Sequence, residues 1–397
     1  MTTETGRKGS GKALFLSTTA FGVSFAVWGL IAALAPTFTQ VYNLSATEKS
    51  LMIAVPVLLG SIGRIGAGML ADRFGGRNVF SALLVFSAIP AIAIGFSTSF
   101  TQLIIFGLFL GIAGTTFPVG VGFTSRWFAP EKQGSALGVY GMGNIGQSIA
   151  VFFAPVLAMQ LGDWRTVFFI FAAVSLLWGA VFFFSAENDT STARPKSISE
   201  MLSPLKTSST AWILSLFYFL TFGGFVALAL YMPTFLRELY DLTPTDAGAR
   251  TAGFVVLATL MRPVGGTLAD KMGGARVLMV VFLAIAVLAL FLSFSHIALF
   301  TVGALGTAAA LGLGNGAVFK LVPQYFPKET GTVTGLVGAF GGLGGFFPPL
   351  ELGIVKQATG SYTIGFVLLS AFAVVCFAVN YISFIRKRSE AAEPAAA

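Results

Sequence analysis

Two arginines, Arg64 and Arg262, each lie near the middle of a long apolar stretch of the sequence. Lys320 lies in the inner half of a third stretch, and Glu351, near the outer end of a fourth, is the one candidate acid. A charged group at membrane depth costs roughly 2.5–3.5 kcal/mol on insertion scales and usually serves a function. The guanidinium group offers a planar fork of donors that suits a small oxyanion and keeps its charge. Two central positive charges without a central carboxylate predict an anion site. The alternative is that each arginine pairs with backbone carbonyls or extends to the membrane surface.

Aromatic and amide side chains could complete such a site. Phe117 lies in the middle of one apolar stretch, while Tyr218 and Phe222 are four residues apart in another and share a helix face. Flat rings can sandwich a flat anion, and the tyrosine hydroxyl can donate a hydrogen bond. Asn144 is the strongly polar side chain at midplane depth in its own stretch, and its amide can donate as well. Because the chain has 41 phenylalanines, packing or lipid contact is the alternative for the rings.

The composition indicates which elements must position these residues. Of the 397 residues, 55% are hydrophobic and only 10% are charged, whereas soluble proteins carry roughly 25% charged residues. The mean hydropathy of +0.85 agrees with lipid as the main solvent. A helix that crosses a bilayer needs about 20 mainly apolar residues. Twelve stretches meet this requirement and predict an all-α membrane protein: 13–38, 49–71, 78–97, 102–126, 135–160, 165–185, 211–236, 248–269, 276–294, 297–322, 331–355 and 362–385.

The sequence contains little that would support other kinds of chemistry. A single cysteine, Cys376, excludes a disulfide framework, and a single histidine, His296, argues against a histidine-rich metal site. The net charge of +8 would suggest nucleic acid in a soluble domain, but in a membrane protein it indicates basic cytoplasmic loops. We recognise no nucleophile–base constellation, and we expect neither an enzyme nor a cofactor.

Basic residues also predict the topology. With both termini on the inner side, sixteen of the 24 Lys and Arg residues lie in inner segments and five in outer segments, which predicts cytoplasmic termini. The segment 186–210 is polar and rich in Ser, Thr and Pro, as expected of a cytoplasmic linker. We therefore expect an N-terminal six-helix bundle over 1–185 and a C-terminal six-helix bundle over 211–397.

The two halves contain an internal repeat. GRIGAGMLADRFGGR at 63–77 resembles MRPVGGTLADKMGGAR at 261–276, and Arg64 and Arg262 are 198 residues apart, about half of the chain. Asp72 and Asp270 have the same separation. Such repeats are how many transporters build a midplane site. An aspartate here can cap a neighbouring helix or pair with a basic residue, and so latch one conformation. A generic tight turn is the alternative.

The stretch GMLADRFGGR resembles the signature between the second and third helices of the major facilitator superfamily, and TLADKMGGAR resembles its second copy. The resemblance extends along the whole chain and implies two six-helix repeats. It also implies that Asp72, Arg73 and Asp270 belong to a conformational latch.

Two glycine-rich stretches occupy matching places in the halves: GSALGVYGMGNIGQ at 134–147 and GTVTGLVGAFGGLGGFFPP at 331–349. Small residues let helices approach closely and let backbone dipoles reach a substrate, although a packing seam is the alternative.

Together with the two arginines, these motifs resemble the nitrate/nitrite porter (NarK-type) family. The resemblance implies that Arg64 and Arg262 bind the anion and that Phe117, Tyr218 and Phe222 form an aromatic clamp. Its signature motifs correspond to Gly141, Gly143 and Asn144, and to Gly338, Gly341, Gly342, Gly344 and Gly345. Lys320 departs from the pattern, because exchanging members carry an uncharged polar residue there.

The expected function is transport of nitrate, and of nitrite, by alternating access. Repulsion between the two arginines opposes closure of the empty carrier, and a bound anion relieves it, which favours nitrate/nitrite exchange. Lys320 leaves nitrate–proton symport open, because a buried lysine titrates readily; the alternative is that it extends toward the cytoplasm. The rival functions are exchange of another small anion, such as a short carboxylate, and a membrane receptor. The family default is a monomer, and the compact loops fit a bacterial inner membrane.

Overall fold

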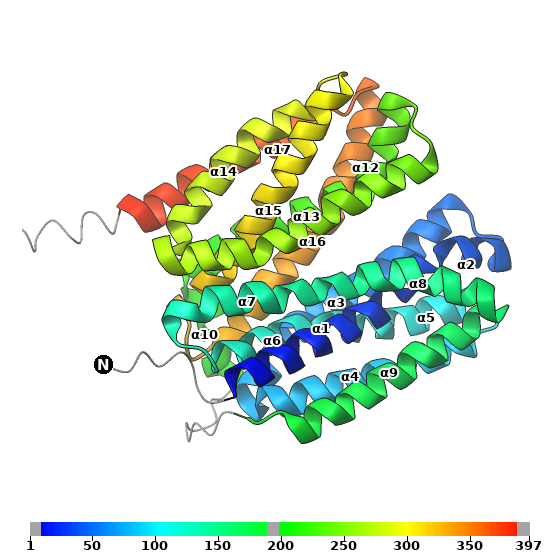
Figure 1. The fold of residues 1–397 in the computed structure, drawn as a ribbon, viewed down its shortest axis with the longest axis horizontal. Helices are drawn as coiled ribbons and strands as arrows, with labels where there is room; N and C mark the ends of the chain where they lie inside the picture. Colours follow the sequence, from blue (N-terminus) through cyan, green and yellow to red (C-terminus); the bar gives the residue numbers. More distant parts are fainter. Residues whose placement is uncertain (1–8, 189–197, 387–397) are drawn as a thin grey trace, which may run out of the picture. The chain divides into compact units, whose positions relative to one another are not determined.

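The computed structural model describes residues 9–188 and 198–386, and it contains helices but no strand within those ranges. Figure 1 shows the helices in chain order. They are α1 Ser10–Ala33, α2 Ala35–Tyr42, α3 Ala46–Phe74, α4 Gly76–Gly95, α5 Phe100–Leu110, η1 Gly111–Thr115, α6 Thr116–Ser125, η2 Pro130–Lys132, α7 Gln133–Gly141, η3 Met142–Asn144, α8 Ile145–Leu161, α9 Trp164–Ser185, α10 Ile198–Thr207, α11 Ser209–Tyr218, η4 Phe219–Gly223, α12 Gly224–Tyr240, α13 Pro244–Met272, α14 Gly274–Phe291, α15 Ile297–Tyr325, α16 Thr330–Thr359, α17 Thr363–Asn380 and η5 Tyr381–Arg386.

The predicted all-helical membrane fold is confirmed. Among the described residues, 11 helical stretches are long and apolar enough to cross a membrane, and they coincide with predicted spans to within a few residues. The first, for example, was expected at 13–38 and runs from Ser10 to Tyr42. The remaining predicted stretch, 331–355, falls in α16. The side chain of Glu351, in the same helix, lies outside the described residues.

Local sequence explains where α3 begins and where α3 and α13 end. Ser45 caps α3: its hydroxyl accepts from the backbone N–H of Glu48, and the Glu48 carboxylate accepts from the Ser45 backbone N–H at 2.9 Å. Both helices end at a glycine with positive φ, Gly75 at 85° and Gly273 at 89°. L-residues with side chains rarely adopt this backbone, so glycine is required there. Gly75 and Gly273 are 198 residues apart, like the arginines.

The helices form two compact units that differ from the two sequence halves. Unit 1 comprises the described residues of Met1–Ala129, Val139–Thr207 and Phe326–Ala339, and unit 2 those of Pro130–Gly138, Ser208–Tyr325 and Phe340–Ala397. In unit 1, α1 packs on α8 and α9, α4 packs on α9, and α3 packs on η1 and α6. In unit 2, α15 packs on α13 and α14, and α14 also packs on α17. The boundary between the units passes through α7 and α16. The first part of α7 therefore belongs to unit 2, although it comes from the N-terminal half of the sequence. The first part of α16 belongs to unit 1, although it comes from the C-terminal half.

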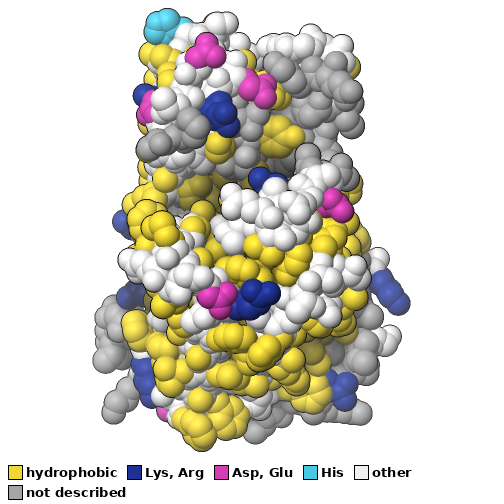
Figure 2. Space-filling model, turned by 90° about the vertical axis from the view of Figure 1, so that its right-hand side faces the viewer, with side chains coloured by type: hydrophobic (Ala, Val, Ile, Leu, Met, Phe, Trp, Pro, Cys, Tyr) yellow, Lys and Arg dark blue, Asp and Glu magenta, His cyan; other side chains and the backbone are white. Residues whose placement is uncertain are grey.

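The outer surface of both units is apolar. Large hydrophobic side chains such as Phe152, Met159 and Phe184 in unit 1 and Val280 in unit 2 are more than half exposed. Figure 2 shows the molecule toward one end of the helices, where hydrophobic side chains lie among scattered charged ones. Apolar areas of this extent are unfavourable in water, and together with the helix lengths they indicate contact with lipid.

Candidate functional site

Arg64, one of the two predicted anion ligands, is held at a defined place in unit 1. Only 1% of its surface is exposed. Its Nε donates to the carbonyl oxygen of Gly114 at 3.1 Å, and its Nη1 donates to that of Gly338 at 2.7 Å. The guanidinium therefore joins α3, η1 and the first part of α16. Pairing with carbonyls was the alternative to anion binding, but the two are compatible, because a guanidinium has five N–H donors.

Phe117 lies beside Arg64. A Cβ added to Gly338 would lie 3.2 Å from Arg64 Cδ and 3.7 Å from Phe117 Cδ1, so the two side chains border the same glycine. The Phe117 ring packs on Phe21 at 5.3 Å and on Tyr140 at 5.8 Å between centroids. Tyr140 also donates from its hydroxyl to the Phe117 carbonyl at 3.0 Å. Two aromatic residues that the sequence analysis did not single out thus hold the predicted clamp residue in place.

The predicted glycine motif of unit 1 packs on α1. Gly141 ends α7, and Gly143 and Asn144 lie in the tight turn η3 that leads into α8; all three are buried. A Cβ at Gly143 would lie 2.7 Å from the carbonyl oxygen of Thr18 and would meet the ring of Phe21. Because Phe21 also contacts Phe117, the Asn144 turn is connected to the surroundings of Arg64 through α1.

In unit 2 the structure brings Arg262, Phe222 and Tyr218 together. Arg262 is buried in α13, and its guanidinium carbon lies 6.0 Å from the centre of the Phe222 ring. Phe222 and Tyr218 are stacked, with 5.0 Å between centroids and 9° between planes. Phe319 of α15, which was not predicted, contacts Tyr218 edge-on at 4.6 Å. A cation over an aromatic face is favourable, so this cluster can hold Arg262 in one orientation.

A π-helical turn and two glycines shape this aromatic pair. Tyr218 ends α11, and Phe222 lies in the π-helical turn η4. π-Helical turns are rare in proteins overall, but those that occur are often found at functional sites. A Cβ at Gly341 would overlap the Tyr218 ring and lie 3.2 Å from Phe222 Cδ1, and a Cβ at Gly344 would lie 3.0 Å from Gly223 Cα. The second glycine motif therefore packs directly on the predicted clamp, with Gly342 buried beside it.

Replacing Gly341 by alanine is expected to lower the stability of the protein by about 1–3 kcal/mol, because the added methyl group forces the Tyr218 ring from its stacked position. Gly253→Ala is the matched control: Gly253 is also helical and in unit 2, but a Cβ there meets nothing within 4 Å. Alanine should raise helix stability at that site by up to about 1 kcal/mol. Thermal unfolding in detergent measures the stability of both variants. Equal unfolding midpoints for the two variants would contradict the close packing of Gly341 on Tyr218.

Asp72 makes the contacts expected of the predicted latch in unit 1. Its carboxylate accepts from the backbone N–H of Gly331 at 3.1 Å and of Thr332 at 2.7 Å, and from the Thr332 hydroxyl at 2.8 Å. These groups belong to the first turn of α16, where N–H groups lack helical partners and the helix dipole favours a negative charge. Arg126 Nη2 lies 3.2 Å from the same carboxylate. Asp72 thus joins α3 to α16, helices from opposite sequence halves.

Asp270 makes the same arrangement in unit 2. It accepts from the backbone N–H of Gly134 at 2.8 Å and of Ser135 at 2.7 Å, at the start of α7, and from the Ser135 hydroxyl at 2.8 Å. The Nζ of Lys320 lies 2.8 Å from Asp270 Oδ1 and also donates to the carbonyl of Pro130. Lys320, the residue considered for coupling, is therefore the ion-pair partner of Asp270 in the second predicted latch.

The latch cations differ from what the sequence motif suggested. Arg73 is exposed, and its guanidinium lies 5.3 Å from the Phe74 ring, whereas Arg126 contacts Asp72. The repeat offset of 198 residues places Gln324 opposite Arg126, and Lys320 lies one helical turn before Gln324. A search for a basic residue within one turn of that position gives Lys320 and Lys328, and the structure pairs Lys320 with Asp270.

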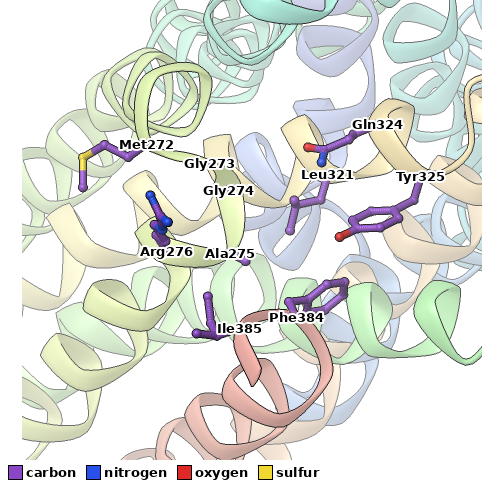
Figure 3. Close-up of a pocket in the computed structure, with 10 residues that line it drawn as sticks. All are labelled: Met272, Gly273, Gly274, Ala275, Arg276, Leu321, Gln324, Tyr325, Phe384 and Ile385. Carbon is purple, nitrogen blue, oxygen red and sulfur yellow. The ribbon is translucent and has the colours of Figure 1, made fainter. Parts of the chain in front are cut away.

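A cavity of about 400 Å³ lies elsewhere in unit 2 (Figure 3). The loop between α13 and α14, the last turn of α15 and η5 line it. Met272 and Leu321, two of its lining residues, follow closely after the latch residues Asp270 and Lys320. Its lining includes none of the predicted anion ligands, so it is distinct from the candidate site.

Comparison with family models and with known sequences identifies what the chain resembles. A model described as Major Facilitator Superfamily matches residues 16–349 and 214–397. A protein of Bacillus subtilis named "Nitrite extrusion protein" is 45% identical over 368 residues, which cover 92% of each chain. A protein of Mycobacterium tuberculosis named "Probable nitrate/nitrite transporter NarK2" is 38% identical over 93% of this chain and 95% of its own.

Solved structures show the same fold. The human organic anion transporter MFSD10 gives a TM-score of 0.80 at 15% identity and covers 94% of this chain and 99% of its own. The fucose:proton symporter FucP of Escherichia coli gives a TM-score of 0.77 at 17% identity, with the same coverage. At these identities the likeness concerns the fold alone.

Proposed function

The chain belongs to the Major Facilitator Superfamily, and we propose that it moves nitrate and nitrite across a membrane by alternating access. The superfamily assignment made from the paired GMLADRFGGR and TLADKMGGAR motifs is confirmed by the family model. The names of the relatives from Bacillus subtilis, Mycobacterium tuberculosis and Staphylococcus epidermidis refer to nitrite or nitrate transport. Each of these relatives matches more than 90% of this chain, so the comparison supports the function for the whole protein.

The observation that carries the proposal is the repeated buried arginine. Arg64 and Arg262 occupy equivalent repeat positions, have 1% and 3% of their surfaces exposed, and each adjoins a predicted clamp ring. Burying an arginine twice at matching places is costly, and a function in anion binding accounts for it. We assign both arginines to the transported anion, with Phe117 in unit 1 and Tyr218 and Phe222 in unit 2 as the flanking rings.

We further propose that transport is nitrate/nitrite exchange. Proton symport needs a side chain that is free to carry the proton, and Lys320 is the candidate for it. Lys320 instead holds Asp270 and the Pro130 carbonyl, so its charge serves the latch. An anion is then needed to return the carrier, which couples nitrate entry to the exit of a second anion.

The topology belongs to the same proposal. The division into a bundle over 1–185, a cytoplasmic linker over 186–210 and a bundle over 211–397 follows from the repeat and the basic loops. Within this linker, Ile198–Thr207 form α10, and α11 begins at Ser209. Both termini face the cytoplasm, the membrane is a bacterial plasma membrane, and the working form is a monomer.

In vesicles reconstituted with the purified protein, nitrate uptake should require nitrite or nitrate inside. An inward proton gradient without internal anion should give no uptake beyond that of protein-free vesicles. Gradient-driven uptake into anion-free vesicles would contradict exchange while leaving nitrate as the substrate. External formate or oxalate at equal concentration should not compete; strong competition, with no uptake of nitrate itself, would identify a carboxylate exchanger instead.

A further inference from the structure

Asn315 is a buried polar residue of α15 that neither the latch nor the proposed arginine clusters use. Only 2% of its surface is exposed, and its Oδ1 has no hydrogen-bond partner among residues 9–188 and 198–386. A buried amide oxygen without a partner costs roughly 1–3 kcal/mol. Because a half-turn about χ2 exchanges the amide oxygen and nitrogen, Asn315 can present Nδ2 as a donor in place of Oδ1. Such a group is expected to have a partner that the protein alone does not supply.

The helical periodicity of α15 shows where Asn315 lies in unit 2. Gly312 and Gly316 face α13: a Cβ at Gly316 would meet the backbone carbonyl of Arg262, and one at Gly312 would lie 2.8 Å from Met261 Cβ. On another side, a Cβ at Gly314 would lie 2.5 Å from the side chain of Thr221 in η4. Successive residues turn by about 100° around a helix, so Asn315 lies between these two sides.

Between those sides lies the cluster around Arg262. Phe319 follows Asn315 by four residues and therefore shares its face of α15. The Phe319 ring contacts Tyr218, Tyr218 stacks on Phe222, and the Arg262 guanidinium lies over Phe222. Asn315 is thus one turn along the helix from a ring that already packs on the proposed anion-binding cluster.

The internal repeat independently indicates that Asn315 belongs to the cluster around Arg262. The offset of 198 residues that relates Arg64 to Arg262 relates Phe117 to Asn315. Phe117 borders Arg64 at Gly338 in unit 1. Unit 2 therefore has an amide at the place where unit 1 has a clamp ring. Conversely, Asn144 in the first half corresponds to Gly342 in the second, so the two halves carry their amides on different helices.

We propose that Asn315 is a further ligand of the transported anion and donates to the oxygen that distinguishes nitrate from nitrite. This inference rests on the proposed function. Nitrate has three oxygens in one plane, whereas nitrite has two. Nitrate therefore offers one acceptor oxygen more than nitrite, and one additional donor in the plane of the anion favours nitrate. An amide fits this role because it is neutral and donates without adding charge.

The test measures the KM of nitrate and of nitrite for Asn315→Ala in reconstituted vesicles under exchange conditions. Loss of a hydrogen bond to a charged group should raise the nitrate KM about 10- to 100-fold, with a smaller rise for nitrite. Thr307→Val is the matched control, because Thr307 is fully buried in α15 with an unpartnered Oγ1 among the described residues, yet two turns away. Its two KM values should stay close to those of the unaltered protein.

Each other outcome overturns a defined part of the inference. Equal changes for both anions, or no change in Asn315→Ala, would overturn the role of Asn315 while leaving nitrate transport in place. No nitrate transport by the unaltered protein would overturn the proposed function and this inference together. If the alanine variant does not fold, Asn315→Asp tests the inference, because aspartate keeps the shape of the asparagine side chain and adds a negative charge. It should abolish nitrate binding, and binding with unchanged affinity would refute the assignment.

Discussion

Replacing Arg262 by lysine is expected to lower nitrate transport by about a hundred-fold or more without unfolding the protein. Lysine keeps the positive charge but offers a compact ammonium instead of a planar fork, and it cannot bind two oxygens of one anion in parallel. Each hydrogen bond to a charged group contributes roughly 1.5–3 kcal/mol, and 1.4 kcal/mol corresponds to a factor of ten. Loss of one bond of a bidentate pair, with the poorer placement of the remaining charge, accounts for the expected factor.

Arg64→Lys provides the comparison within the repeat. Arg64 also donates to the carbonyls of Gly114 and Gly338, so its replacement should reduce both transport and the unfolding temperature. Arg276→Lys is the control, because Arg276 is exposed at the start of α14 and outside the proposed site. Nitrate exchange in vesicles and thermal unfolding in detergent are measured for all three. Near-normal exchange by Arg262→Lys would rule out bidentate binding there.

Most of the architecture could be predicted from local properties of the sequence. Apolar stretches of about 20 residues locate the helices, because a bilayer imposes that length on each of them. The repeat then pairs Arg64 with Arg262 and Asp72 with Asp270, and the structure gives both aspartates the same contacts at a helix start. These features depend on spacing along the chain, which a sequence displays directly.

Side-chain pairs that meet across helices could not be predicted from the sequence. Arg126 reaches Asp72 over 54 residues and Lys320 reaches Asp270 over 50, and no local motif marks either pair. Tyr140 supports Phe117 in the same way. The π-helical turn that contains Phe222 has no sequence signature that we recognise. Asn315 could have been found from the sequence, because the repeat offset of 198 residues applied to Phe117 leads to it. It was overlooked because it lies in an apolar stretch.

The second large effect is expected at the latch of unit 2. Asp270→Asn removes the negative charge that holds Lys320 and weakens the cap on the first turn of α7. Breaking a buried ion pair by removing one partner costs about 3–5 kcal/mol, because the other charge stays buried. We therefore expect a large fall in the unfolding temperature in detergent.

The equivalent change in unit 1 should cost less, although the carboxylate contacts are nearly identical. The side chain of Arg126 is 26% exposed, whereas that of Lys320 is 10% exposed, so water can solvate Arg126 after Asp72→Asn. The double variant Asp270→Asn, Lys320→Met should recover part of the stability lost by Asp270→Asn, because no unpaired charge remains. In unit 1, Asp72→Asn, Arg126→Met should recover little. Equal losses for Asp72→Asn and Asp270→Asn, or no recovery in the unit 2 double variant, would show that helix capping rather than charge pairing stabilises both latches.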